Sequence, residues 1–126
     1  MRYLGIDYGK KRIGIALSDP GGLIAFPHGT MKTLKDIVAL VGKEEPEAIV
    51  VGLPISFGGR ASEQTREVRA FAARLREAVQ LPIAFENEVL TTRIARRHTE
   101  PGKADAAAAA LILQAYLDRK NELLRH

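Results

Sequence analysis

Cysteine is absent from the sequence, and so is any long apolar run. Without cysteine the chain can form no disulfide bridge and no thiolate metal site, and its composition fits a reducing compartment. A membrane span requires roughly 18 apolar residues, which no segment approaches. The first apolar stretch is interrupted by Asp7 and by the basic residues from Lys10 to Arg12, so we expect no signal peptide. We therefore predict a cytoplasmic protein with no membrane partner.

The length of 126 residues is typical of one domain with its own hydrophobic core, so we predict a single domain over 1–126. The chain contains 19 lysines and arginines against 15 aspartates and glutamates, which gives a net charge of +4. This excess is compatible with a polyanionic partner such as nucleic acid. It does not identify that partner, because many basic proteins bind no polyanion.

Apolar patterns predict strands and helices throughout this domain. The first two strands form a hairpin around Gly9 to Lys11, with Asp7 as the last residue of the first strand. A third antiparallel strand is expected at Leu23 to Phe26, before Pro27. The remaining expected elements are a helix over 33–44 with Thr33 as N-cap, a buried strand over 48–54, a long helix from Ser62 and Glu63 to Val79, a strand over 81–85, a short basic helix over 90–97, and a last helix with Asp105 in its first turn.

This order of elements predicts an α/β fold. We expect a five-stranded mixed sheet whose first three strands are antiparallel, with helices on both faces. Strands one, four and five are expected to be neighbours at its centre. The carboxyl ends of strands one and five then lie at one edge, where ligand sites of α/β proteins gather.

Three acidic residues fall near this edge. Asp7 ends the first strand, Glu88 follows the fifth, and Asp105 can reach the first strand because Ala108 and Ala109 give its helix a small contacting face. Three converging carboxylates require cations, and hard oxygen ligands suit Mg²⁺ or Mn²⁺. Two such ions, roughly 3.5–4 Å apart, support phosphodiester hydrolysis.

Each acid also has an ordinary interpretation. Asp7 can cap the hairpin turn, Glu88 can be a solvated loop residue, and Asp105 can be a first-turn acid favoured by the helix dipole. Composition and spacing alone do not bring the three together. Both interpretations therefore remain open from the residues themselves.

Basic and hydroxyl side chains lie beside these acids in the sequence. They are candidates for binding the phosphate backbone of a nucleic acid, although a solvated surface or a helix N-cap explains them equally well. The hairpin tip contributes Lys10, Lys11 and Arg12, and the short helix contributes Thr91, Thr92, Arg93, Arg96 and Arg97.

Four segments of the sequence closely resemble the YqgF-type proteins, a family of pre-16S rRNA nucleases also described as Holliday-junction-resolvase-like. These segments are Leu4 to Asp19, Ile49 to Pro54 with the Gly-rich loop after it, Glu88 with Leu90-Thr91-Thr92, and Asp105 to Asp118. Together they span nearly the whole chain. The resemblance implies a ribonuclease-H-like fold and a metal-dependent nuclease, with Asp7, Glu88 and Asp105 on the family's metal-binding acids.

The sequence departs from this family at two positions near Glu88. Asn87 and Val89 stand where the family usually has aspartate and arginine, so one acid is neutral and one phosphate-binding residue is missing. The stretch between Arg97 and Asp105 is also shorter than usual and less basic. These departures bear on the grip on the substrate more than on the cleavage chemistry.

Three hypotheses follow for the function. The first is a metal-dependent endonuclease acting on structured RNA, chiefly a ribosomal RNA precursor. The second keeps this chemistry on branched DNA, which requires a two-fold homodimer to cut two strands symmetrically. The third is a non-catalytic nucleic-acid-binding module. Asp7-Tyr8-Gly9 also resembles the phosphate hairpin of sugar kinases and actin-like ATPases, but those enzymes need two such domains.

Overall fold

The hairpin at the start of the chain forms two central strands of the sheet. The computed structural model describes residues 2–54, 63–88 and 101–124. Strand β1 (Tyr3–Tyr8) pairs antiparallel with β2 (Ile13–Ser18). Tyr8 still pairs with Ile13, so the strand continues one residue beyond its expected end. Asp7 therefore lies inside β1, directly opposite Gly14 of β2.

The third strand begins later and runs further than expected. β3 spans Ala25–Met31, so the third antiparallel strand is confirmed, but its predicted bounds, Leu23 to Phe26, were wrong. The carboxylate of Asp19 accepts hydrogen bonds from the backbone N–H groups of Leu23 (2.7 Å) and Ile24 (2.8 Å), which holds these residues in a loop. The bonds from Ile24 and Leu23 also lower the pKa of Asp19 below its ordinary value.

β3 tolerates a proline because it is an edge strand with a bulge. Ile15 of β2 pairs with Gly29, whereas the next residue, Ala16, pairs with Pro27. His28 is therefore the extra, unpaired residue of the bulge, next to Gly29 with a φ of 151°. An edge strand has one side without a partner, so the missing N–H of proline costs it little.

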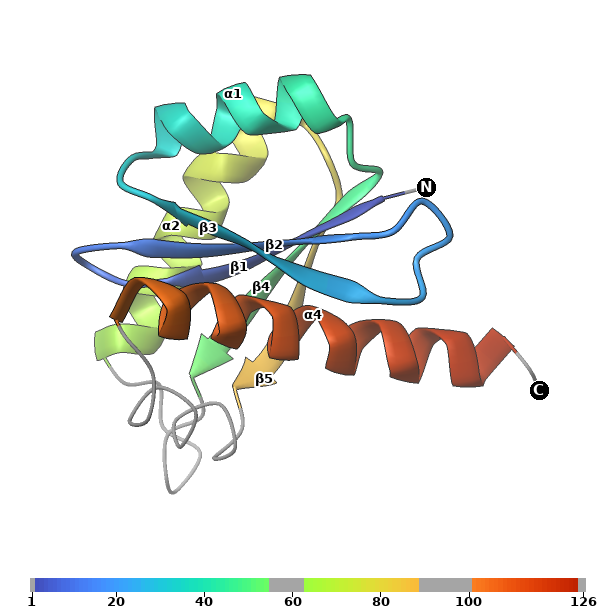
Figure 1. The fold of residues 1–126 in the computed structure, drawn as a ribbon. Helices are drawn as coiled ribbons and strands as arrows, with labels where there is room; N and C mark the ends of the chain where they lie inside the picture. Colours follow the sequence, from blue (N-terminus) through green and yellow to red (C-terminus); the bar gives the residue numbers. More distant parts are fainter. Residues whose placement is uncertain (1, 55–62, 89–100, 125–126) are drawn as a thin grey trace.

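The sheet is completed by two parallel strands. β4 (Ala48–Pro54) pairs with β1, and β5 (Ile83–Glu88) pairs with β4. The order is β3-β2-β1-β4-β5 (Figure 1), so β5 is an edge strand separated from β1 by β4. Two expectations were therefore wrong: β5 is not central, and Glu86, Asn87 and Glu88 belong to the strand itself. The carboxyl ends of β1 and β5 do lie at the same edge.

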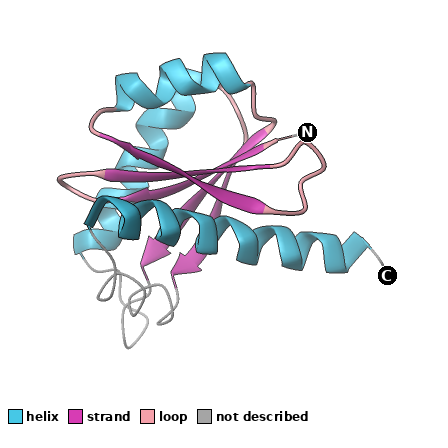
Figure 2. Ribbon diagram, in the orientation of Figure 1, coloured by secondary structure: helices cyan, strands magenta, loops and turns pink. Residues whose placement is uncertain are grey.

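Helices cover both faces of the mixed sheet, as the sequence predicts (Figure 2). α1 (Leu34–Glu44), with Thr33 as its N-cap, and α2 (Glu63–Val79) pack on one face. α4 (Pro101–Leu124) crosses the other face. The helix predicted over 90–97 and the N-terminal Ser62 of the long helix lie outside the described residues. No helix in the described segments is both long and apolar enough to cross a membrane.

Candidate active site

Asp7 is a buried carboxylate on the face of the sheet that α4 covers. Its side chain belongs to the same face as Gly5, two residues earlier in the strand, and a Cβ on Gly5 would lie 2.7 Å from Cβ of Leu113 in α4. Asp7 is only 5% exposed. A carboxylate this deeply buried normally requires positive charge or hydrogen-bond donors around it. Its position therefore distinguishes Asp7 from an ordinary solvated turn residue.

Asp105 is carried to the sheet by the start of α4. The helix begins at Pro101, a residue well suited to the first helical position, so Asp105 lies in the second turn rather than the first. The interpretation of Asp105 as a first-turn acid was therefore wrong. Ala108 and Ala109 are fully buried against the sheet, which confirms the small contacting face expected of this helix.

Gly14 places the backbone of Asp105 beside Asp7. A Cβ on Gly14 would overlap the carbonyl oxygen of Asp105, so the helix lies directly on this glycine. Gly14 is in turn the residue opposite Asp7 in the hairpin, where Cα atoms of paired residues are about 4.5–5.5 Å apart. Two acids that are far apart in the sequence therefore both adjoin one glycine.

Arg12 of the hairpin tip binds the carboxylate of Asp105. Its Nε donates to Oδ2 of Asp105 at 2.7 Å, and the two side chains are 40% and 20% exposed. Arg12 thus supplies positive charge directly beside Asp105. One oxygen of Asp105 is engaged by this contact.

The other residues of the hairpin tip have different surroundings from Arg12. Lys10 lies 3.5 Å from Glu67 of α2 and is 77% exposed, while Lys11 is exposed at the tip. Tyr8 stacks on Phe71 of the core with ring centroids 4.4 Å apart. Tyr8 is therefore a packing residue, and of the three basic residues at the tip only Arg12 contacts Asp105 in the structure.

Glu88 is the last residue of β5 and pairs with Pro54 of β4. Its backbone lies at the same edge of the sheet as Asp7, two strands away, which corresponds to roughly 10 Å. The side chain of Glu88 lies outside the described residues, and so do Thr91, Thr92 and Arg93. Among the described residues no three acids or histidines form a group able to hold a metal ion.

Comparisons with known proteins bear on the whole chain. The family model described as "RuvX: Holliday junction resolvase" matches residues 1–119. The chain belongs to the RuvX family. A Salinibacter ruber relative named "Putative pre-16S rRNA nuclease" is 40% identical, and the match covers 94% of this chain and 93% of the relative. A relative of the same name from Nitratidesulfovibrio vulgaris is 38% identical, and the match covers 95% of this chain and 86% of the relative. Another from Dehalococcoides mccartyi is 40% identical, and the match covers 90% of this chain and 95% of the relative.

The fold of this RuvX-family chain is similar to that of a solved RuvC. A structure described as Thermus thermophilus RuvC in complex with a Holliday junction substrate matches with a TM-score of 0.63 and 18% identity. The match covers 95% of this chain and 96% of the RuvC chain. The predicted ribonuclease-H-like architecture is thereby confirmed.

The RuvX-family chain also carries an ion pair between a buried glutamate and a partly exposed arginine, which the sequence did not predict. Glu86 pairs in register with Gly52 of β4, and its side chain is 7% exposed. Nη1 of Arg119 in α4 donates to Oε1 of Glu86 at 2.6 Å, and this hydrogen bond raises the pKa of Arg119. The other oxygen, Oε2, is buried without a hydrogen-bond partner. Alternation along β5 places Glu86 on the same face as Ala84, which is a signal for its inward position. Nothing in the sequence indicated Arg119 as its partner.

Removing Arg119 is expected to destabilise the protein because it leaves the carboxylate of Glu86 buried and unpaired. Arg119→Met should lower the free energy of unfolding by about 1–2 kcal/mol, a range reduced because Arg119 is 57% exposed. Urea unfolding measures this loss. Arg74→Met, which changes an exposed arginine of α2, is the matched control.

The double variant Glu86→Leu/Arg119→Met tests the reason for this loss. An apolar pair leaves no charge in the buried position, so the double variant should regain most of the stability. If Arg119→Met unfolds at the same urea concentration as the wild type, the ion pair contributes nothing and the explanation is wrong.

Proposed function

We propose that this protein is a metal-dependent endonuclease that cleaves structured RNA, with the 5′ region of a pre-16S rRNA as its substrate. The names of the curated relatives support the choice of RNA. The observation that carries the chemistry is that Asp7 and the backbone of Asp105 both adjoin Gly14. This assignment places the protein in the cytoplasm, where rRNA precursors are processed.

The acids fit a site for hard cations. Asp7 and Asp105 offer carboxylate oxygens, which Mg²⁺ and Mn²⁺ prefer, and Glu88 at the same sheet edge is the proposed third ligand. When bound, two such ions activate water and stabilise the departing oxygen of a phosphodiester. The chain itself supplies no nucleophile in this mechanism.

The residues around the acids have separate roles in this proposal. The buried position of Asp7 keeps its carboxylate in one orientation, which is the contribution expected of a rigid strand. Arg12 is close enough to Asp105 to contact a phosphate held at the acids, and its charge favours the polyanion. Lys10, Lys11, Thr91, Thr92 and Arg93 remain proposed contacts to the nucleic acid on either side.

A cleavage assay on two substrates tests the function. Purified protein is incubated with a precursor 16S rRNA fragment and with a four-way DNA junction, with Mg²⁺, with Mn²⁺ and with EDTA. We expect metal-dependent cleavage of the RNA and little cleavage of the junction. RNA that is bound but never cut under any of these conditions would support the non-catalytic module instead.

The alternative substrate is a branched DNA, which the description of the family model favours. Symmetrical cutting of a junction requires two copies related by a two-fold axis. Sedimentation at the concentration used for cleavage therefore separates the two hypotheses. A homodimer that cuts the junction in preference to the RNA would replace our proposal, whereas a monomer argues for the RNA substrate.

A further inference from the structure

A basic groove runs along the edge of β3, beside the hairpin that carries Asp7. It lies between β3 and α1 and has a volume of about 580 Å³. The lining includes Arg12, Lys32 and Lys43, with Asp36 as the acidic member. Positive charges therefore exceed negative charges on its walls.

Arg12 makes this groove continuous with the candidate active site. The same side chain lines the groove and binds Asp105 at 2.7 Å. The register of the sheet leads to the same conclusion, because Met31 and Thr30 of β3 pair with Ile13 and Gly14 of β2. The groove therefore begins at the level of the acids and extends away from them along β3.

The bulge in β3 opens the edge between the two faces of the sheet. His28 and Thr30 line this groove and also a second hollow on the α4 side of β3, which includes Lys103. His28 is the extra residue of the bulge and is exposed. Bulges at sheet edges commonly redirect side chains next to functional sites. A strand of nucleic acid can thus pass from the acids, across this edge, to the groove.

Two lysines of the groove carry charges that the fold does not neutralise. Lys32 and Lys43 are exposed, and among the described residues neither takes part in an ion pair. Lys43 lies in the last turn of α1, where its positive charge also interacts favourably with the helix dipole. Lys32 precedes α1 and has no such role.

We propose that this groove is a second contact surface for the nucleic acid, where Lys32 and Lys43 bind backbone phosphates several nucleotides from the cleavage point. The proposal rests on the nuclease function above and specifies the path of its substrate. α1 has 11 residues and is therefore roughly 16 Å long. At the spacing of phosphates along one strand of duplex DNA, this length corresponds to about five phosphates. Phosphate contacts of this kind position a substrate and do not read its sequence.

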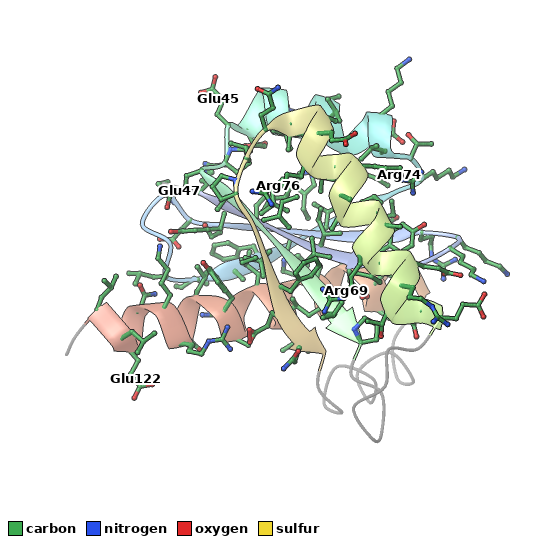
Figure 3. The ribbon with its side chains drawn as sticks, turned by 180° about the vertical axis from the view of Figure 1, so that it is seen from behind. Glu45, Glu47, Arg69, Arg74, Arg76 and Glu122 are labelled. Carbon is green, nitrogen blue, oxygen red and sulfur yellow. The ribbon has the colours of Figure 1, made fainter. Side chains whose placement is uncertain are left out.

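The test compares two double variants that each lower the net charge by two. Lys32→Gln/Lys43→Gln neutralises the groove, and Arg74→Gln/Arg76→Gln neutralises exposed arginines of α2, labelled in Figure 3. Binding to the precursor 16S rRNA fragment is measured in EDTA over a series of salt concentrations. We expect the groove variant to bind about tenfold more weakly at about 0.1 M salt. The slope of log affinity against log salt should fall in magnitude by about 1.4–1.8.

The outcomes separate this proposal from the function on which it rests. A control variant with an unchanged slope, together with the loss in the groove variant, supports the groove. Equal losses in both variants indicate a general charge effect and overturn it, and so does an unchanged groove variant. A lower melting temperature without a change in slope shows that Lys43 acts only on α1, which also overturns it. Failure of the nuclease function appears separately, as a wild-type protein that cleaves neither substrate.

Discussion

Asp7→Asn is expected to lower the rate of RNA cleavage at least about 10³-fold while the protein stays folded. Asn retains the size of the side chain but loses the negative charge that holds a divalent cation, and metal ions contribute several kcal/mol to such reactions. Asp7 is only 5% exposed, and asparagine fills nearly the same space, so the variant should keep the fold and unfold in one cooperative thermal transition. Single-turnover cleavage at saturating metal and thermal unfolding measure the two quantities.

Asp118→Asn is the matched control for this experiment. Asp118 is an exposed residue of α4 that accepts a hydrogen bond from Gln114, and it is not part of the proposed metal site. The same chemical change there should leave the cleavage rate within about twofold of the wild type, as for most surface substitutions. If the Asp7 variant cuts as fast as this control, Asp7 holds no catalytic metal and the proposed chemistry is wrong.

Gly14→Ala is expected to cause the largest loss of stability. Its Cβ would fall on the carbonyl oxygen of Asp105, and the backbone of a docked helix cannot move aside as a flexible side chain can. Overpacking typically costs 1–3 kcal/mol, and we expect about 3 kcal/mol here. Displacing Asp105 by about 1 Å should also reduce cleavage about 10²-fold. Urea unfolding measures the loss of stability. Cleavage assays without urea, at a temperature where the variant is folded, measure the loss of activity.

Gly42→Ala provides the comparison for the same substitution in an open position. Gly42 lies in α1, and a Cβ there meets nothing within 4 Å. Alanine is the better helix former, so this variant should gain about 0.5–1 kcal/mol without a change in cleavage. If Gly14→Ala is as stable as Gly42→Ala, α4 does not rest on Gly14 in solution.

Local patterns predicted most of the fold, because each element carries its own signal. The hairpin, α1 with its N-cap, and α2 with its buried apolar face follow from alternation, helical spacing and capping chemistry. The predictions that were wrong depended on contacts distant in sequence or on competing local bonds. β3 starts late because Asp19 captures the N–H groups of Leu23 and Ile24, which an apolar pattern does not reveal.

The candidate site was less predictable because it depends on how α4 lies on the sheet. The sequence indicated that Asp105 could reach Asp7, but the helix start at Pro101 and the contact with Gly14 required the structure. The pairing of Glu86 with Arg119 likewise depends on the crossing of α4 over β5. The catalytic roles of Asp7, Glu88 and Asp105 stay predictions until the variants are measured.

The docking of α4 on the hairpin also sets the order in which the site forms during synthesis. The contact between Arg12 and Asp105 joins residues separated by 93 positions. Contacts this distant in sequence form only after a large loss of chain entropy, and they arise late when a protein folds from its N-terminus. The hairpin can form early, but Asp105 reaches Gly14 and Arg12 only after α4 has left the ribosome. By this route, a nascent or truncated chain without α4 lacks half of the candidate site.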